Sequence, residues 1–338
     1  MSGLLFHKIL VTGGAGYCGT QLVDGLLSVG LEVCVYDIGY FGFRGLDVNH
    51  PNLTVIKGDV RDISCFTRAV QGFEAVIHLA CISNDASFEL DERLSTSINL
   101  EAFEPLVKSA KKAGVKRFIY ASSSSVYGVS DADEVTEDHP LVPLTLYNKY
   151  KGMCEPILNQ YKSESFEVVT FRPATVCGYS RRQRLDLSVN ILTNHAITNH
   201  KIIVFGGTQK RPNLHIKDYV RACLMFLNAP AEKINGQIFN VGHRNLSIQA
   251  IAELVRDVVL SEFEDISDIA IERTTSDDLR SYHVNSEKIA SELGFQPIYT
   301  VEDAVRDLCN AFKLGSLPNS MASDDYYNIR VMKSLESS

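Results

Sequence analysis

Strand-like and helix-like segments alternate along the first half of the chain. Short apolar runs that predict strands occupy residues 8–12, 32–36, 53–58, 74–80 and 166–176, and residues 115–128 predict a strand that runs into a serine loop. Segments with helical apolar spacing lie between them, at residues 20–29, 62–70, 95–113 and 145–163. This alternation predicts an α/β protein whose parallel sheet carries helices on both faces. Ligands of such doubly wound sheets bind beyond the carboxyl ends of the strands.

The first strand–helix–strand unit, residues 8–37, contains a glycine-rich turn and ends in an acid. Gly13 allows a sharp turn out of the strand, Gly16 allows the backbone to approach a pyrophosphate, and Gly19 allows close packing of the helix on the sheet. The helix N-terminus then offers N–H groups to phosphates. Asp37 follows Gly19 by 18 residues and suits the two ribose hydroxyls. The unit therefore predicts a Rossmann fold that binds NAD rather than NADP.

The alternating pattern loosens after about residue 178. A basic loop leads into a helix, two short strands flank Gly206–Gly207, and helical spacing covers 217–228, 247–260, 286–293 and 301–314. This pattern predicts a smaller C-terminal lobe that closes over a ligand. We expect three regions: an NAD-binding Rossmann domain over 1–178 with returns near 214–245, a discontinuous substrate-binding lobe over 179–314, and a tail over 315–338 that is extended or mobile.

Composition narrows the class of protein. The 338 residues are 45% hydrophobic with a formal net charge of −8, which argues against a general nucleic-acid binder. No apolar run approaches 18 residues, so we expect no membrane span. The first strand begins within eight residues of the start, so we expect no signal peptide. Eight scattered cysteines without a CxxC pair indicate reduced thiols, hence the cytoplasm.

Ser123, Tyr147 and Lys151 form the candidate reactive group. Tyr147 and Lys151 stand four residues apart on a predicted helix, so their side chains share one face. A lysine ammonium favours the phenolate form of a tyrosine, which would let Tyr147 act as a base near neutral pH. A Tyr-x-x-x-Lys pair also occurs by chance on helix surfaces. Its place after a nucleotide-binding unit and a strand-end serine loop favours the catalytic interpretation.

Five motifs together resemble the extended short-chain dehydrogenase/reductases that act on nucleotide sugars, over residues 7–314. They are TGGAGYCG (12–19), GDVRD (58–62), HLA (78–80), SSSSVYG (122–128) and YNKYK (147–151). The resemblance implies that Ser123 holds the substrate oxygen and that Lys151 holds the nicotinamide ribose. The cofactor site that it implies comprises Gly13, Gly16, Tyr17, Cys18, Gly19, Asp37, Asp59, Val60, Leu79, Ala80, Tyr147 and Lys151.

The resemblance also implies a nucleoside-diphosphate sugar as substrate, linked to GDP, UDP or dTDP. Ser83, Asn84 and Thr175 are then expected to face the sugar. Arg211 is the first candidate for its diphosphate, because a guanidinium binds phosphate with two parallel hydrogen bonds. Asn190 and Arg280 are further candidates. The sequence does not decide between a diphosphate-binding role and a solvated surface position for Arg181, Arg182 and Arg184.

The residues that follow Ser123 limit the type of reaction that the chain can catalyse. The 4,6-dehydratases that the chain resembles carry an Asp-Glu pair there, whereas this chain has Ser124 and Ser125, which cannot serve as carboxylate acid and base. We therefore expect an epimerase that works through a 4-keto intermediate. The first alternative is a 4-dehydrogenase or reductase, and behind it stand a 4,6-dehydratase and a non-catalytic NAD-binding sensor. Residues 171–190 and 210–218 are similar to a bacterial subgroup that includes GDP-heptose 4-dehydrogenase, which leaves the dehydrogenase open.

The remaining expectations concern histidines, metals and assembly. No metal-ligand spacing such as HxxxH appears, so we expect no metal, and His78, His215 and His243 are expected to be structural. Asp218 is expected to cap the helix that follows it. By resemblance alone, two long helices at about 95–113 and 145–163 would pair with those of a second copy, which implies a homodimer.

Overall fold

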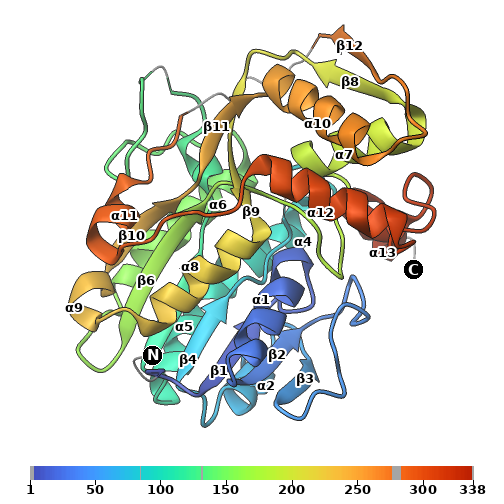
Figure 1. The fold of residues 1–338 in the computed structure, drawn as a ribbon. Coiled ribbons are helices and arrows are strands. Elements are labelled where there is room, and N and C mark those ends of the chain that lie inside the picture. The colour runs from blue at the N-terminus through green and yellow to red at the C-terminus, as the bar shows by residue number, and fades with distance from the viewer. Residues whose placement is uncertain (1–3, 84, 131, 276–282, 337–338) are drawn as a thin grey trace.

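A seven-stranded parallel sheet forms the centre of the computed structural model, which describes residues 4–83, 85–130, 132–275 and 283–336. The strand order is β10-β6-β5-β4-β1-β2-β3 (Figure 1). The order runs outward in both directions from β1, as in doubly wound sheets, so the predicted α/β fold is confirmed. The strands span β1 Lys8–Thr12, β2 Glu32–Asp37, β3 Leu53–Lys57, β4 Ala75–His78, β5 Arg117–Ala121, β6 Glu167–Pro173 and β10 Gln237–Val241.

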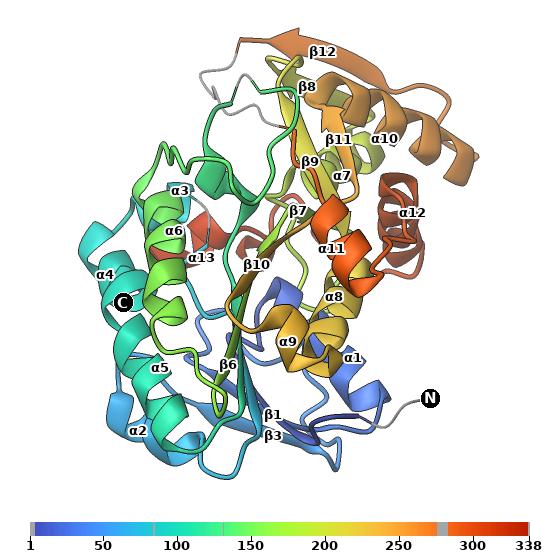
Figure 2. The same cartoon turned by 90° about the vertical axis from the view of Figure 1, so that its left-hand side faces the viewer.

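Helices cover both faces of this sheet because every central strand is apolar on both sides. In β1, Ile9 and Val11 join the core under α1 and α8, while Leu10 joins the opposite core under α2, α5 and α6. Figure 2 shows these two groups of helices on opposite sides of the sheet. Their bounds are α1 Tyr17–Ser28, α8 Ile216–Asn228, α2 Ile63–Ala69, α5 Phe103–Lys112 and α6 Leu146–Asn159.

A smaller lobe sits beyond the carboxyl ends of the central strands. It contains a three-stranded sheet (β11-β9-β7) and a two-stranded sheet (β12-β8), with a core shared by α7, α10 and α12 (Figure 1). Its strands are β7 Thr175–Cys177, β8 Lys201–Phe205, β9 Lys210–His215, β11 Arg244–Ser247 and β12 Ala270–Thr274. The other helices are α3 Asp85–Phe88, α4 Glu92–Thr96, α7 Ser188–Asn199, α9 Ala231–Ile234, α10 Ile248–Glu262, α11 Glu287–Leu293, α12 Val301–Lys313 and α13 Asn328–Glu336.

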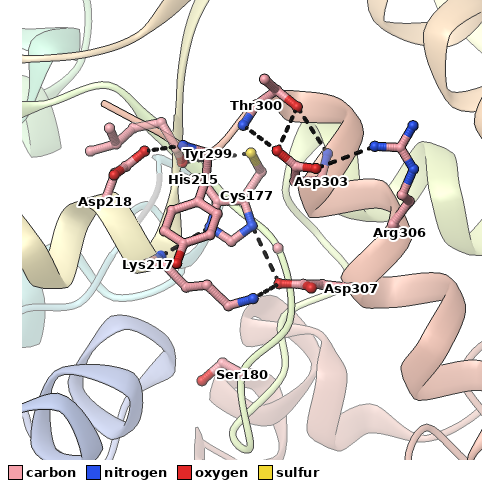
Figure 3. A network of polar contacts seen from close by, with 12 residues as sticks. Cys177, Ser180, His215, Lys217, Asp218, Tyr299, Thr300, Asp303, Arg306 and Asp307 are labelled. Atoms are coloured by element: carbon pink, nitrogen blue, oxygen red, sulfur yellow. Dashed lines mark hydrogen bonds and ion pairs between the residues drawn. The ribbon is translucent and has the colours of Figure 1, made fainter. Parts of the chain in front are cut away.

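A polar network joins α12 to the point where β9 runs into α8 (Figure 3). His215 Nε2 and Lys217 Nζ lie 3.3 and 2.7 Å from Asp307 Oδ2 on α12. The backbone N–H of Tyr299 donates to Asp218 Oδ2 at 2.9 Å. The expected cap at Asp218 is therefore wrong: His215 is the N-cap of α8, and its Nδ1 accepts from the N–H of Lys217. Asp218 instead holds the chain that leads into α12.

The C-terminal tail ends in a helix where we expected an extended or mobile arm. Residues 328–336 form α13, and Tyr327 and Met332 are buried at 7% and 4% exposure. The Tyr327 hydroxyl accepts from Asn194 Nδ2 on α7 at 3.2 Å and donates to the carbonyl of Ser320 at 3.0 Å. A few apolar anchors are enough to fold this segment back, although its composition is rich in serine and asparagine. No described helix is both long and apolar enough to cross a membrane.

His78 ends β4 inside the core rather than in a polar site. Its Nδ1 lies 2.8 Å from Thr12 Oγ1, and its ring packs against Phe103, Phe118 and Tyr120. Burial, with a smaller contribution from the positive charge of Lys151, lowers the pKa of His78 to about 3. The ring therefore stays neutral in the folded chain.

We predict that acid destabilises the protein through His78. Between pH 6.5 and 3 the unfolded chain binds one proton more at this residue, so this contribution to stability is complete above pH 6.5 and falls with pH. From pH 7 to pH 5 the loss is about 2 kcal/mol. Urea unfolding at both pH values should show a loss smaller by that amount in His78→Asn than in the wild type. An equal loss in both proteins would contradict the prediction.

Candidate active site

A cavity of about 790 Å³ lies where the carboxyl ends of β1, β2, β4 and β5 face the smaller lobe. Its lining comes from segments far apart in the sequence: the glycine turn, the loops after β2, β4 and β5, the first turns of α6, the loop after β7, and the start of α13. Topology brings the loops after β1, β2, β4 and β5 together, because parallel strands end at the same edge of a sheet. The site is therefore built by the fold rather than by neighbouring residues.

The glycine turn is too tight for side chains. Gly13 has φ +73°, and a Cβ there would lie 2.6 Å from the backbone N of Ala80. A Cβ on Gly19 would overlap the backbone oxygen of Gly13 and the Cα of Gly14. Gly16 is the N-cap of α1 and makes no side-chain cap, so the first N–H groups of the helix are left to a ligand. This cradle fits a diphosphate.

Asp37 closes the cradle at the end of β2. Its two carboxylate oxygens accept from the backbone N–H groups of Ala15 (3.0 Å) and Gly39 (2.8 Å), which fixes the carboxylate. Burial raises the pKa of Asp37, against these hydrogen bonds. Each oxygen keeps lone pairs that can accept from hydroxyl groups of a ribose. Asp59, by contrast, lines the cavity but is held by Arg61 Nε at 2.9 Å.

Ser123, Tyr147 and Lys151 line the same cavity. Tyr147 and Lys151 lie on successive turns of α6, whose N-cap is Thr145. Lys151 Nζ donates to the backbone oxygen of Ala121 at 2.7 Å, which places the ammonium at the carboxyl end of β5. The structure thus brings together the three residues that the sequence singled out. Their catalytic roles remain predictions.

The same stripe of α6 continues to a buried ion pair. Glu155 and Arg172 are 4% and 3% exposed, and Arg172 Nη2 lies 2.6 Å from Glu155 Oε2. Ser122, beside Ser123, donates to Glu155 Oε1 at 2.6 Å. This pair ties α6, β6 and the serine loop to one another. Sequence reasoning missed it, although Glu155 stands four residues after Lys151 on the same helical face.

Comparison with known proteins agrees with this geometry. The model of the NAD-dependent epimerase/dehydratase family matches residues 9–242. The chain belongs to this family. It is 32% identical over 230 residues to the uncharacterized protein y4nG of Sinorhizobium fredii, a match that covers 67% of this chain and 54% of that protein.

Other relatives match over more of their length. The chain is 27% identical to a UDP-glucose 4-epimerase of Corynebacterium glutamicum, covering 88% of this chain and 94% of the relative. It is also 27% identical to a dTDP-glucose 4,6-dehydratase of Streptomyces griseus, covering 88% and 91%. The structure of Bordetella bronchiseptica WbmG in complex with NAD aligns with a TM-score of 0.76 at 26% identity, covering 94% of this chain and 97% of WbmG. The cofactor of the family is NAD, which the glycine cradle and Asp37 fit.

The loop after β4 carries further predicted residues of this family member. Leu79, Ala80 and Ser83 line the cavity, as do Tyr17, Cys18, Val60 and Thr175. The amide of Asn99 holds the loop, because it accepts from the N–H of Ile82 and donates to the Ile82 carbonyl, both at 2.9 Å. Asn99 lies in a π-helical turn, residues 97–101, that interrupts the single helix expected over 95–113. Such turns often mark functional sites.

Of the residues predicted to bind the diphosphate, Arg211 lines the cavity and Asn190 does not. Arg211 lines the cavity from β9. Asn190 is fully buried, is not among the residues that line the cavity, and uses its amide within the protein: Oδ1 accepts from the N–H of Gly178 at 3.0 Å, and Nδ2 donates to the carbonyl of Arg184 at 2.9 Å. Asn84 and Arg280 lie outside the described residues. No described cluster of three or more His, Cys, Asp or Glu residues could hold a metal.

The cavity lining also includes residues that the sequence did not assign to it, among them Arg182, Arg184, Asp186 and Asn328. Arg182 and Arg184, which the sequence left open, are both 7% exposed and face the cavity rather than solvent. Asp186 accompanies Arg184 at 2.8 Å. Asn328, the first residue of α13, comes from the far end of the chain. The only signal in the sequence was the density of arginines in residues 181–184.

We predict that alanine substitutions at Gly16 and Gly19 impair different properties, NAD binding in the first case and stability in the second. Gly16 has φ −78°, which alanine tolerates, and its Cβ would lie 3.3 Å from the oxygen of Gly13. Gly16→Ala should keep the fold and weaken NAD binding about tenfold or more, because the methyl group enters the cradle. Gly19→Ala should destabilise the chain by about 1–3 kcal/mol, because its methyl group meets backbone. Calorimetric NAD titration and urea unfolding of each variant test this. Equal effects of the two variants on unfolding would contradict it.

Proposed function

We propose that this chain is an NAD-dependent nucleotide-sugar epimerase that works through a 4-keto intermediate. The observation that carries the proposal is the convergence of Ser123, Tyr147 and Lys151 on the cavity that also contains the glycine cradle. NAD, when bound, supplies a nicotinamide ring that accepts a hydride and returns it. Relatives named as UDP-glucose 4-epimerases support the choice of reaction.

The carboxylates of the cavity argue against dehydration. Its described lining includes three of them, Asp37, Asp59 and Asp186. Asp37 accepts from backbone N–H groups at the cradle, Asp59 is held by an arginine, and Asp186 pairs with another. None belongs to the serine loop. An elimination needs an acid and a base placed on neighbouring carbons of the sugar. Hydride transfer at one carbon needs only the groups that are present.

The chain's own residues divide this chemistry between them. We assign Tyr147 as the base that takes the proton of the sugar hydroxyl and later returns it. Lys151, anchored on the carbonyl of Ala121, supplies a positive charge that favours the phenolate. The Oγ of Ser123 lies 2.7 Å from that of Ser125, which in turn donates to Asn148 Oδ1. This chain of contacts fixes the hydroxyl that would bind the substrate oxygen.

The substrate class follows from the relatives and from the cations of the smaller lobe. Relatives named for UDP- and dTDP-sugars make a nucleoside-diphosphate sugar the substrate to test first, together with a GDP-linked sugar. We assign its diphosphate to Arg211, and Ser83 and Thr175 to the sugar. We also propose a homodimer through α5 and α6, which pack side by side on one face of the sheet (Figure 2).

We predict that Tyr147→Phe lowers kcat by about 10²–10⁴-fold, the usual contribution of general acid–base catalysis, and leaves NAD bound. A panel of GDP-, UDP- and dTDP-sugars, followed by NMR of the products and by NADH absorbance, gives the measurement. Tyr150→Phe is the matched control: Tyr150 lies on the same helix, accepts from Thr96 Oγ1 at 3.4 Å, and is not among the cavity-lining residues. Full activity of Tyr147→Phe would overturn the assignment of the base.

The same panel separates the possible reactions when it is run in D₂O. An epimerase returns the hydride that it removed, so a new diastereomer forms without net NADH and without solvent deuterium in the sugar. A dehydrogenase would give stoichiometric NADH. Solvent deuterium at C5, in a product that has lost water, would indicate a dehydratase and would overturn the proposal. Bound NAD with no turnover on any sugar would favour the sensor.

A further inference from the structure

The loop over residues 178–186 is fastened to the first turn of α1. The Tyr17 hydroxyl donates to the carbonyl of Gly178 at 2.8 Å. Ser180 Oγ donates to the carbonyl of Tyr17 at 2.8 Å and lies 2.8 Å from Thr20 Oγ1. Because Tyr17 and Thr20 flank the end of the glycine cradle, the loop lies directly across the N-terminus of α1. Asn190 supports it from behind through its contacts with Gly178 and Arg184.

Two arginines of this loop are buried in the cavity wall and only partly satisfied. Arg182 Nη2 donates to Asn328 Oδ1 at 2.6 Å, and Arg184 Nε donates to Asp186 Oδ1 at 2.8 Å. Arg182 Nε and Arg184 Nη2 have no hydrogen-bond partner among the residues that the structure describes. A buried N–H of a guanidinium without a partner is costly. Both residues line the cavity, so a ligand bound there is the candidate source of the missing acceptors.

The unpartnered N–H groups of Arg182 and Arg184 favour an anionic ligand. Burial, together with the neighbouring charge of Arg184, lowers the pKa of Arg182 to about 9. Burial also opposes the charge of Arg184, but the Asp186 carboxylate outweighs it and holds the pKa of Arg184 above its usual value. Asp186 pairs with Arg184, whereas the carboxylates of Asp186, Asp37 and Asp325 act on Arg182 only through their charge, beside a helix N-terminus. An anionic group with several oxygens would satisfy both arginines and the helix at once.

We propose that Arg182 and Arg184 clamp the diphosphate of NAD from the side of the smaller lobe, and that Asn328 of α13 positions Arg182. The neighbours of Arg182 favour the cofactor over the sugar nucleotide: its guanidinium lies 3.9 Å from the centre of the Phe41 ring, in the loop after β2. A Cβ on Gly45, in the same loop, would lie 3.1 Å from the backbone N of Arg182 and 2.7 Å from Thr20 Cγ2 on α1. These elements form the dinucleotide half of the cavity. The inference does not depend on which sugar reacts.

Binding experiments on the full chain, freed of nucleotide, test the clamp. For Arg182→Gln and Arg184→Gln we expect the Kd of NAD and of ADP-ribose to rise about 10- to 100-fold, the effect of losing a charged hydrogen bond. Binding of adenosine, which lacks the diphosphate, should not change. Asn328→Ala should raise the Kd of NAD as well, and Arg182→Lys should restore part of the affinity that Arg182→Gln loses.

Arg181→Gln is the matched control. Arg181 is the adjacent arginine of the same loop, but its side chain is 49% exposed, it faces Asp24, and it does not line the cavity. The Kd of NAD for Arg181→Gln should stay within twofold of the wild-type value. Thermal unfolding without ligand reports on the fold of every variant. Unchanged NAD binding in both glutamine variants, an equal loss for adenosine, or a loss confined to GDP, UDP or NADP would overturn the proposal.

Discussion

The buried pair between Glu155 and Arg172 is the constraint on which the candidate reactive group depends. Two charges at 4% and 3% exposure persist in a core only when each satisfies the other. Here the carboxylate also accepts from Ser122, and Arg172 Nη1 donates to the Tyr127 hydroxyl at 2.7 Å. One ion pair thereby fixes the position of α6 along β5 and β6. The distance between Ser123 on the loop and the tyrosine and lysine on the helix follows from it.

The glycine cradle shows what a local pattern can predict. Gly13, Gly16, Gly19 and Asp37 lie within one strand–helix–strand unit, so their spacing alone constrains their geometry. The parallel sheet was predictable for a similar reason, because two-sided apolar strands require helices on both faces. Tyr147 and Lys151 were predictable as neighbours because they share a helical face. In each case the relevant contacts are short-range or follow from periodicity.

Residues whose contacts are long-range were less predictable. The amide of Asn190 was expected in the ligand site, but the fold uses it to hold a loop. Arg182 and Arg184 belong to a basic run that is equally typical of a solvated surface, yet both are buried. Their contacts are long-range: Arg182 meets Phe41 and Asn328, and Arg184 Nη1 donates to Ser83 Oγ. The helix expected over 95–113 contains a π turn because Asn99 reaches the backbone of Ile82, which periodicity cannot reveal.

The contact between Asn328 and Ser83 spans 245 positions of the chain. A ribosome adds residues from the N-terminus onward, and domains generally fold in that order. The glycine turn, the serine loop and the stripe of α6 are therefore all synthesised long before the residue that completes the wall around Arg182. A nascent chain would pass through a stage in which the dinucleotide half of the cavity is open on one side. Lasting capture of a dinucleotide would then be among the last events of maturation.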